Sequence, residues 1–407
     1  MPDSIRELRA LIRTSRNKAY TAASAAGWAA GTAHVLPITS VDLTKLVHQG
    51  IESKALQRRL YESDASKAGL SASELSFSIP LGMGSANTTA PFEATLLAAF
   101  FGGLASPTAK TDLCEADCTT TVLNATGHGM SAGMAVLVGA PGDGRGGGEV
   151  RRIASVDTNT ITLEMALAGA PSTGDALVYS HTVYLDQSAT QNYLDILGIG
   201  FHAEDQFQCL GCMGPVTLSG LAEGEEPTMN FNLTVPQWQE VPVGERDQLE
   251  PSVAFAGSGQ APTSKATGAF FLGDWGSTTR AAVESADWSI DPGLKFEYRK
   301  DANYENRMGA CKRVPGRATA GITVYADLDF GLHADFPSTA KQLLWQFGNT
   351  AQACVAITMP RALLTSKPAR KAINNMSGLS LALHGKEPTV AATPANLYSS
   401  AIAVHWF

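Results

Sequence analysis

Charged residues are scarce in this 407-residue chain. Asp, Glu, Lys and Arg make up 17% of it, below the roughly 25% that is usual for a soluble domain. A basic excess is lacking too, because 38 acidic residues outnumber 30 basic ones and leave a net charge of −8. Wrapping nucleic acid needs clustered Lys and Arg, so the composition argues against it. A surface with few charges favours packing against other copies of the same chain.

Long hydrophobic runs are also absent. The longest nearly apolar runs, 94–101 and 134–138, fall far short of the roughly 20 residues that a membrane helix needs. The N-terminal MPDSIRELRALIRTSRNKAY is charged and lacks the apolar stretch of a secretory signal. We therefore expect no membrane span and folding in the cytoplasm.

Cysteine is too sparse for a disulfide scaffold, so we expect reduced, buried thiols. Cys209 and Cys212 form a CxxC, and a CxxxC lies upstream. Four thiolates suit zinc, but the distance between the two pairs fits no zinc knuckle. Cys209 lies in an alternating run, where a buried apolar role is expected. The six cysteines are Cys114, Cys118, Cys209, Cys212, Cys311 and Cys354.

Common catalytic and phosphate-binding motifs are missing: the chain has no GxxxxGK[ST], HExxH or GxSxG. GDGRGGGE has GxGxxG spacing from Gly142, but no helix follows it, as a dinucleotide site requires. The eight histidines are scattered singly. We therefore expect no enzyme activity, no metal and no cofactor.

The first 40 residues are predicted to form an N-terminal arm. Apolar residues between Ile5 and Ile12 recur at helical spacing, and an Ala/Gly-rich stretch, 22–33, follows. This pattern predicts a helical opening and then an adaptable connection.

Two later stretches each combine a strand with a short helix. ELSFSIPLG from Glu74 alternates as a half-buried strand does, and PFEATLLAAFFGG predicts a helix from Pro91 that ends at Gly102. Downstream, RATAGITVYADLDFG predicts a strand and FPSTAKQLLWQFGN a second helix from Pro337. We interpret the repeat as an internal duplication. One irregular α+β domain is the alternative.

Residues 114–181 are predicted to form an inserted small β-barrel that faces outward. VDTNTITL predicts a strand, a turn and a strand, and the glycines between 142 and 148 predict a hairpin tip. The expected fold is mainly β with short helices (β-rich α+β): two β-sandwich domains, each with one flanking helix, plus the insert. The predicted parts are 1–40 (arm), 41–113 with 182–250 (first domain), 114–181 (insert) and 251–407 (second domain).

The order of these elements resembles the tail tube protein, or major tail protein, of long-tailed, siphophage-like bacteriophages. Alternating strands, one Gly-terminated helix, an extended loop and the strand pair GPVTLSGLAEGEEPTMNFNLTV carry the resemblance over most of residues 40–407. The insert resembles the decorative β-modules of tail proteins. In that family a β-sandwich with one flanking helix donates hairpins to a ring, and neighbouring subunits close a barrel around a DNA channel. The type VI secretion tube protein has a related fold.

The resemblance implies a structural virion protein that polymerises as stacked rings into the phage tail tube, the channel for DNA ejection. Two tube domains per chain imply three chains in a pseudo-hexameric ring, whereas one domain implies six. The implied partners are other copies of itself, the tape measure protein, the tail terminator and distal tail proteins, and DNA that passes without specific binding. The implied location is the virion, after assembly in the host cytoplasm.

A channel for DNA should lack adhesive basic patches, so we predict a predominantly negative lumen. The register stays open, because a slip of one residue exchanges the two faces of a strand. The candidate lumen strands are Glu74–Leu81, Phe207–Ser219, Pro227–Val235 and Ala318–Asp327. The candidate lumen or inter-ring residues are Glu74, Asp205, Glu225, Glu226, Asp327 and Asp329.

Two alternatives accompany this prediction. A tail terminator or distal tail protein of the same fold would form one ring and no filament. A glycan-binding or hydrolytic accessory protein would use the acidic pairs 225–226 and 327–329 as catalytic carboxylates, although solvated loops explain both pairs more simply. Glycan binding also needs aromatic platforms, and the insert contains one aromatic residue, Tyr179.

Overall fold

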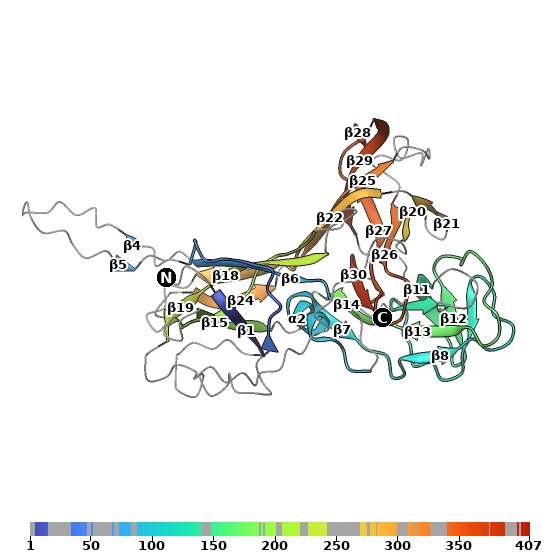
Figure 1. The fold of residues 1–407 in the computed structure, drawn as a ribbon, viewed down its shortest axis with the longest axis horizontal. Helices are drawn as coiled ribbons and strands as arrows, with labels where there is room; N and C mark the ends of the chain where they lie inside the picture. Colours follow the sequence, from blue (N-terminus) through green and yellow to red (C-terminus); the bar gives the residue numbers. More distant parts are fainter. Residues whose placement is uncertain are drawn as a thin grey trace, which may run out of the picture.

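The structure, a computed structural model, is mainly β, as the sequence predicts. Figure 1 shows an elongated molecule with a tall arm of strands rising from its middle. The structure describes residues 5–14, 34–46, 50–51, 67–68, 73–82, 88–139, 148–186, 189, 192–200, 206–219, 227–241, 269–274, 277–281, 283–298, 308–313, 316–325, 340–373, 375–386, 397–398 and 400–407.

The largest sheet has 15 strands, and its main path runs β21-β20-β26-β27-β29-β25-β22-β17-β18-β6-β3. Strands β7, β14, β28 and β30 join it off this path. Its members are β3 (Ser40–Asp42), β6 (Ser73–Pro80), β7 (Gly102–Ala105), β14 (His181–Leu185), β17 (Val216–Ser219), β18 (Thr228–Val235), β20 (Ala269–Asp274), β21 (Ser277–Ala281), β22 (Val283–Asp291), β25 (Arg317–Tyr325), β26 (Lys341–Phe347), β27 (Val355–Leu364), β28 (Ala369–Ile373), β29 (Met376–Gly385) and β30 (Ala403–Trp406).

This long sheet joins strands from both halves of the chain. Strand β17 pairs with β22, so hydrogen bonds connect segments on the two sides of the predicted domain boundary at 250. The C-terminal β30 also pairs with β14, which directly follows the insert. The boundary stays a prediction, and the two halves share one sheet.

A second sheet lies against the long sheet and has the order β19-β16-β15-β1-β2. Leu8 and Ile196 of this sheet share one hydrophobic core with Phe77 and Leu233 of the long sheet, so the two sheets form a sandwich. The strands of the second sheet are β1 (Ile5–Arg13), β2 (His34–Val35), β15 (Tyr193–Gly200), β16 (Gln206–Cys212) and β19 (Gln237–Glu240).

The predicted insert forms a six-stranded sheet of its own, in the order β8-β13-β10-β11-β12-β9. It encloses a separate core that includes Leu123, Ile161 and Tyr179. Its strands are β8 (Thr111–Leu113), β9 (Val122–Asn124), β10 (Ala135–Val138), β11 (Glu149–Val156), β12 (Thr160–Leu163) and β13 (Ala176–Tyr179). Two separate hairpins pair β4 (Gly50–Ile51) with β5 (Lys67–Ala68) and β23 (Leu294–Tyr298) with β24 (Met308–Arg313).

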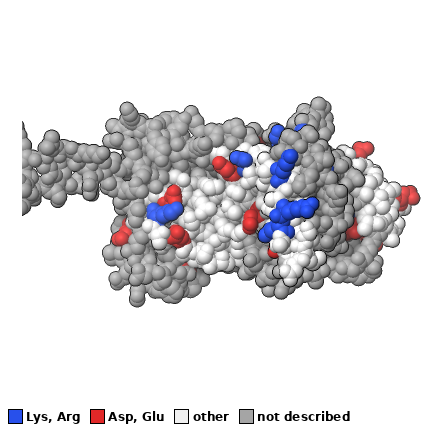
Figure 2. Space-filling view, turned by 90° about the horizontal axis from the view of Figure 1, so that it is seen from above, with Lys and Arg blue, Asp and Glu red and all other residues white. Residues whose placement is uncertain are grey.

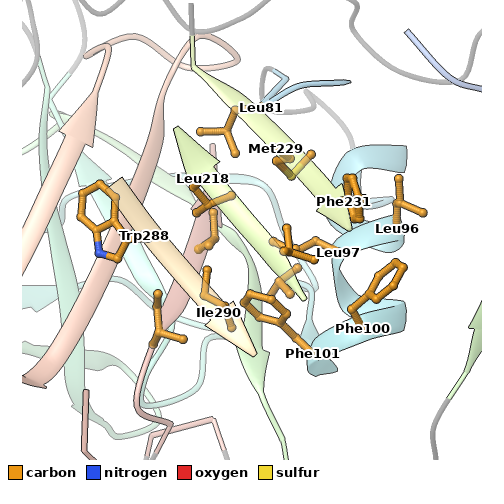
Figure 3. Packing of buried hydrophobic residues seen from close by; sticks show 14 of the residues in the cluster. Leu81, Leu96, Leu97, Phe100, Phe101, Leu218, Met229, Phe231, Trp288 and Ile290 are labelled. Carbon is orange, nitrogen blue, oxygen red and sulfur yellow. The ribbon is translucent and has the colours of Figure 1, made fainter. Parts of the chain in front are cut away.

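The one helix among the described residues, α2, spans Phe92–Phe101, as predicted. Pro91 precedes it, and Gly102 ends it in the left-handed conformation with φ of 97°, which a glycine adopts without steric cost. Figure 3 shows α2 beside β17 and β18, with Phe100 facing Phe231 at a ring-centroid distance of 5.3 Å. Burying each such side chain stabilises the fold by about 1.5–3 kcal/mol. The helix therefore completes the core between the two sheets.

The helical opening predicted near the N-terminus is wrong, because Ile5–Arg13 is strand β1. The strand lies between β15 and β2 and is apolar on both sides. Leu8 and Ala10 face the main core, whereas Leu11 packs with Leu197 on the opposite side. A strand with apolar residues on both faces lacks simple alternation and imitates helical spacing.

The second flanking helix is also wrong over Lys341–Phe347, which is strand β26. Leu343 and Trp345 point into the main core, whereas Leu344 packs toward the insert. Both faces are buried, so Leu343, Leu344 and Trp345 follow one another without alternation, a pattern that does not distinguish a buried strand from a buried helix. The predicted start at Pro337 lies outside the described residues. The interpretation as an internal duplication therefore loses its second helix, which was its main support.

Candidate assembly surfaces

One of the six candidate lumen residues, Glu74, belongs to the described part of the chain. It lies exposed near the start of β6, and its carboxylate accepts a hydrogen bond of 2.8 Å from Lys45 Nζ. The other five fall outside the described residues: Asp205, Glu225, Glu226, Asp327 and Asp329.

The structure brings most of the candidate lumen strands together. Strands β6, β17, β18 and β25 all belong to the long sheet. The candidate stretch Phe207–Ser219 divides, because its first part, β16, lies in the second sheet of the sandwich. If the candidate strands line a channel, most of the lining therefore belongs to the long sheet.

Seven neighbouring strands of the long sheet, β3, β6, β18, β17, β22, β25 and β29, share an outer face, which we call the polar face. A row of directly opposed residues crosses it, and each member is half-buried or exposed. The pairings of six successive strand pairs define this row. In order, its residues are Ser40, Ser78, Asn230, Thr217, Ser289, Thr319 and His384.

Side-chain hydrogen bonds connect neighbours on the polar face. Ser40 Oγ donates to Ser78 Oγ at 3.0 Å, and Ser76 Oγ donates to Asn232 Oδ1 at 2.9 Å. The adjacent register positions point to the other side and form an apolar row in the core: Val41, Phe77, Phe231, Val216, Ile290 and Ala318. Period-two alternation across the sheet therefore separates an apolar core from a hydroxyl- and amide-rich surface.

Charges on the polar face are few and mostly acidic. Asp42, Asp287 and Asp291 are exposed there, against Arg317 on the neighbouring β25. Two hydrogen bonds from Thr44 hold the pKa of Asp42 below its ordinary value, so this carboxylate stays charged. In Figure 2 the described surface seen from above is mostly uncharged, with acidic and basic side chains in small groups.

The sequence interpretation missed β22, the strand of the polar face between β17 and β25. Its sequence, VESADWSID, alternates, with Ala286, Trp288 and Ile290 buried and Asp287 and Ser289 exposed. This period-two pattern is as clear as that of β6 and is sufficient to find the strand. It lies outside the segments that the tail-tube resemblance singled out.

The insert is attached to the long sheet by a buried polar cluster, which we call the docking cluster: Arg152, Glu164, Gln342 and the backbone of Tyr398. Arg152 forms an ion pair with Glu164, and both side chains are almost fully buried. Gln342 Nε2 donates to Glu164 Oε2 at 2.7 Å, and Arg152 Nη2 donates to the Tyr398 carbonyl at 2.8 Å. Burial raises the pKa of Glu164 to about 7, although Arg152 and Gln342 favour its charged form.

A second contact beside the docking cluster fixes the same interface. Gln346 of β26 donates from Nε2 to the Gly148 carbonyl at 2.8 Å and accepts from Val150 N at 2.9 Å. Around it, Leu137 and Val150 of the insert pack with Leu344 of β26. The insert thus lies at one end of the molecule (Figure 1) with one side packed on the long sheet.

Buried polar side chains between the insert and the C-terminal strand also have their partners. His405 lies between the hydroxyls of Thr182 and Thr358, at 2.9 Å from each. Lys110 Nζ donates to the carbonyls of Tyr179 at 2.7 Å and Trp406 at 3.3 Å, and burial lowers its pKa to about 7. These contacts hold strands together, which makes them structural contacts.

The expectation that all thiols are reduced is wrong for two of them. Cys114 and Cys118 form a disulfide at the point where β8 leads toward β9. Glu115 N donates to the Asn124 carbonyl at 2.8 Å beside it, so the ends of the two edge strands of the insert meet there. Cys209, Cys212 and Cys354 are buried thiols outside any disulfide, as expected.

Chemistry-bearing side chains do not gather elsewhere in the described part of the chain. No three His, Cys, Asp or Glu residues there are arranged to hold a metal ion. No described helix is long and apolar enough to cross a membrane. Tyr179, the single aromatic residue of the insert, is fully buried and offers no platform for a sugar. Neither a known protein family nor a curated protein matches this chain.

Proposed function

We propose that this chain is a structural virion protein that assembles with copies of itself into stacked rings, forming a tail tube whose channel is lined by the polar face. The single observation that carries the proposal is the row of small polar residues across seven strands. A polyanion moves along a lining of hydroxyls, amides and scattered carboxylates without being held, because adhesion to DNA needs clustered Lys and Arg.

The partners follow from the same role. A tube of this kind encloses a tape measure protein during assembly, ends at terminator and distal tail proteins, and later conducts DNA into the host. Three chains per ring was the sequence-based expectation, but it depended on two equivalent domains. Because β26 replaces the second predicted helix, the choice between three and six chains needs a direct measurement.

A ring protein at one end of a tail is the second candidate. It is favoured equally by the long sheet, where β3 and β28 each pair on one side among the described strands. Closing sheets into a ring removes exposed edges whether or not rings stack. The two candidates differ in one property, since only the tube protein polymerises without limit. The glycan-binding alternative has no supporting observation.

Negative-stain electron microscopy of the purified full chain at increasing concentration tests the proposal. We expect hollow filaments of stacked rings, and their rotational symmetry gives the number of chains per ring. Discrete rings that never stack would replace the tube with the terminator or distal role. A monomer at all concentrations, in the presence and absence of salt, would contradict both.

A further inference from the structure

A segment of 32 residues in this acidic chain carries basic side chains and no acidic ones. Residues 355–386, which we call the basic arm, contain no Asp or Glu, although the whole chain has a net charge of −8. The arm comprises β27, β28 and β29, and Figure 1 shows β28 and β29 at its far end, away from the sandwich. The five basic residues of the arm are Arg361, Lys367, Arg370, Lys371 and Lys386.

The end of the basic arm is an open strand edge. Within the described residues β28 pairs only with β29, and its four residues Ala369–Ala372 are exposed. Lys371 forms an ion pair of 3.3 Å with Glu284. Lys367 and Arg370 are exposed and have no ion-pair partner in the described part of the chain. An edge strand with exposed positive charge can form backbone hydrogen bonds with an added strand that carries negative charge.

An acidic open edge lies at the opposite end of the polar face. Among the described strands, β3 pairs only with β6, on one of its two sides. Asp42 on this strand is exposed and accepts hydrogen bonds from the amide and the hydroxyl of Thr44. Glu74 lies nearby on β6, where it forms an ion pair with Lys45. The polar face therefore ends in an acidic edge on one side and a basic edge on the other.

We infer that β28 of one copy docks along β3 of the next copy, with the basic arm against Asp42, so that the polar face continues from subunit to subunit. Because the two edges differ, the contact is head-to-tail, and repeated head-to-tail contacts form a ring when the rotation from copy to copy closes. Opposite charges at the two edges also disfavour pairing of like edges. The inference rests on the proposed assembly and names the surfaces that build it.

Cysteine cross-linking between two singly substituted proteins tests the contact. Ser40→Cys and Ala369→Cys place one thiol on each exposed edge. After mild oxidation with diamide, a mixture of the two should give a covalent dimer on a non-reducing gel, and neither protein alone should give one. Mixing Ser40→Cys with Thr173→Cys, an exposed site on the insert, is the matched control. Equal dimer yields in the mixture and this control, or dimers from either protein alone, would overturn the contact.

Charge exchange gives a second, non-covalent test. Asp42→Lys, or Lys367→Glu with Arg370→Glu, should raise the protein concentration for half-assembly about tenfold or more. The three changes together should restore assembly, because the opposite charges then face each other with exchanged signs. Thr173→Lys controls for added charge, and sedimentation velocity reports the assembled fraction. Failure of the triple variant to recover would count against the contact.

Microscopy of the same samples separates this inference from the proposed function. Tubes that form normally in the Asp42→Lys variant and in the Lys367→Glu/Arg370→Glu variant would overturn the β28–β3 contact and leave the tube function intact. Cross-linked closed rings that never stack would keep the contact and remove the tube function.

Discussion

The insert and the polar sheet are both built from antiparallel strands, but they complete their interactions differently. The insert has its own core and its own sheet, and its charged pair Arg152–Glu164 is buried inside the chain. The sheet that carries the polar face collects strands from β3 to β29 and exposes its charged residues, and within the described residues β3 and β28 at its two ends each pair on one side. The comparison teaches that the buried polar groups of the insert find their partners inside the same chain, whereas the sheet keeps its polar groups at the surface.

The largest effect is expected at the docking cluster. Arg152→Ala leaves the buried Glu164 carboxylate without its ion-pair partner. Such a loss destabilises a protein by about 3–5 kcal/mol. Urea denaturation followed by circular dichroism should show this decrease in the free energy of unfolding.

A double variant shows whether the pair or its packing matters. Arg152→Met with Glu164→Met removes both charges and keeps apolar volume, so it should be clearly more stable than Arg152→Met alone. A double variant as unstable as the single one would show that the ion pair is not what fixes the insert to the sheet.

A smaller loss of stability is expected when the disulfide of the insert is removed. The Cys114–Cys118 disulfide closes a loop with a sequence separation of 4, and the chain-entropy relation gives about 2 kcal/mol for so short a loop. Dithiothreitol should lower the free energy of unfolding by this amount in the wild type and not in Cys114→Ala/Cys118→Ala. Thiol titration of the unfolded, unreduced protein should find two thiols fewer than after reduction; equal numbers would exclude the bond.

The sequence predicted those parts of the fold whose pattern is local. The β-rich class, helix α2 and the strand–turn–strand of β11 and β12 are confirmed, because Pro91, Gly102 and simple alternation mark them directly. Strands β1 and β26 were predicted as helices because each strand is buried on both of its faces. In each strand, segments far away in the chain cover one of these faces. Pairing between distant strands leaves no trace in a single sequence.

The candidate site was predicted only in part for the same reason. The sequence predicted β6, β17, β18 and β25 as candidate lining strands, but the row from Ser40 to His384 needs the register of six strand pairs. The named acidic residues were chosen for charge, whereas the polar face consists chiefly of Ser, Thr and Asn side chains, which carry no distinctive signal. The basic arm, in contrast, is visible in the sequence as a stretch without any acid.

The pH dependence of stability should reveal the buried groups of the insert interface. Glu164 has a folded pKa of about 7 against 4.5 in its unperturbed state, so the folded protein holds an extra proton between these values. The free energy of unfolding should therefore fall as pH rises through this window. Lys110 has a folded pKa of about 7 against 10.5, so the folded protein lacks a proton above pH 7 and its stability should rise toward pH 10.

Two variants separate these contributions. Glu164→Gln should flatten the slope below pH 7, and Lys110→Met should flatten the slope above it. Each slope is at most about 1.4 kcal/mol per pH unit, the value for one proton. Urea denaturation across the pH series measures both, and unchanged slopes in the variants would assign the pH dependence to other groups.

The smallest effect is expected on the polar face itself. Lys45 and Glu74 form an exposed ion pair of 2.8 Å, with side-chain exposures of 68% and 55%, and solvent weakens such exposed pairs. A double-mutant cycle with Lys45→Ala and Glu74→Ala should give a small coupling energy that disappears in high salt. If the contact between copies covers the edge beside β3, the coupling should grow in the assembled protein, because removal of water strengthens the attraction between the two charges. A coupling energy equal in the monomer and the assembly would place Glu74 outside the contact between copies, and the acidic edge would then be carried by Asp42 alone.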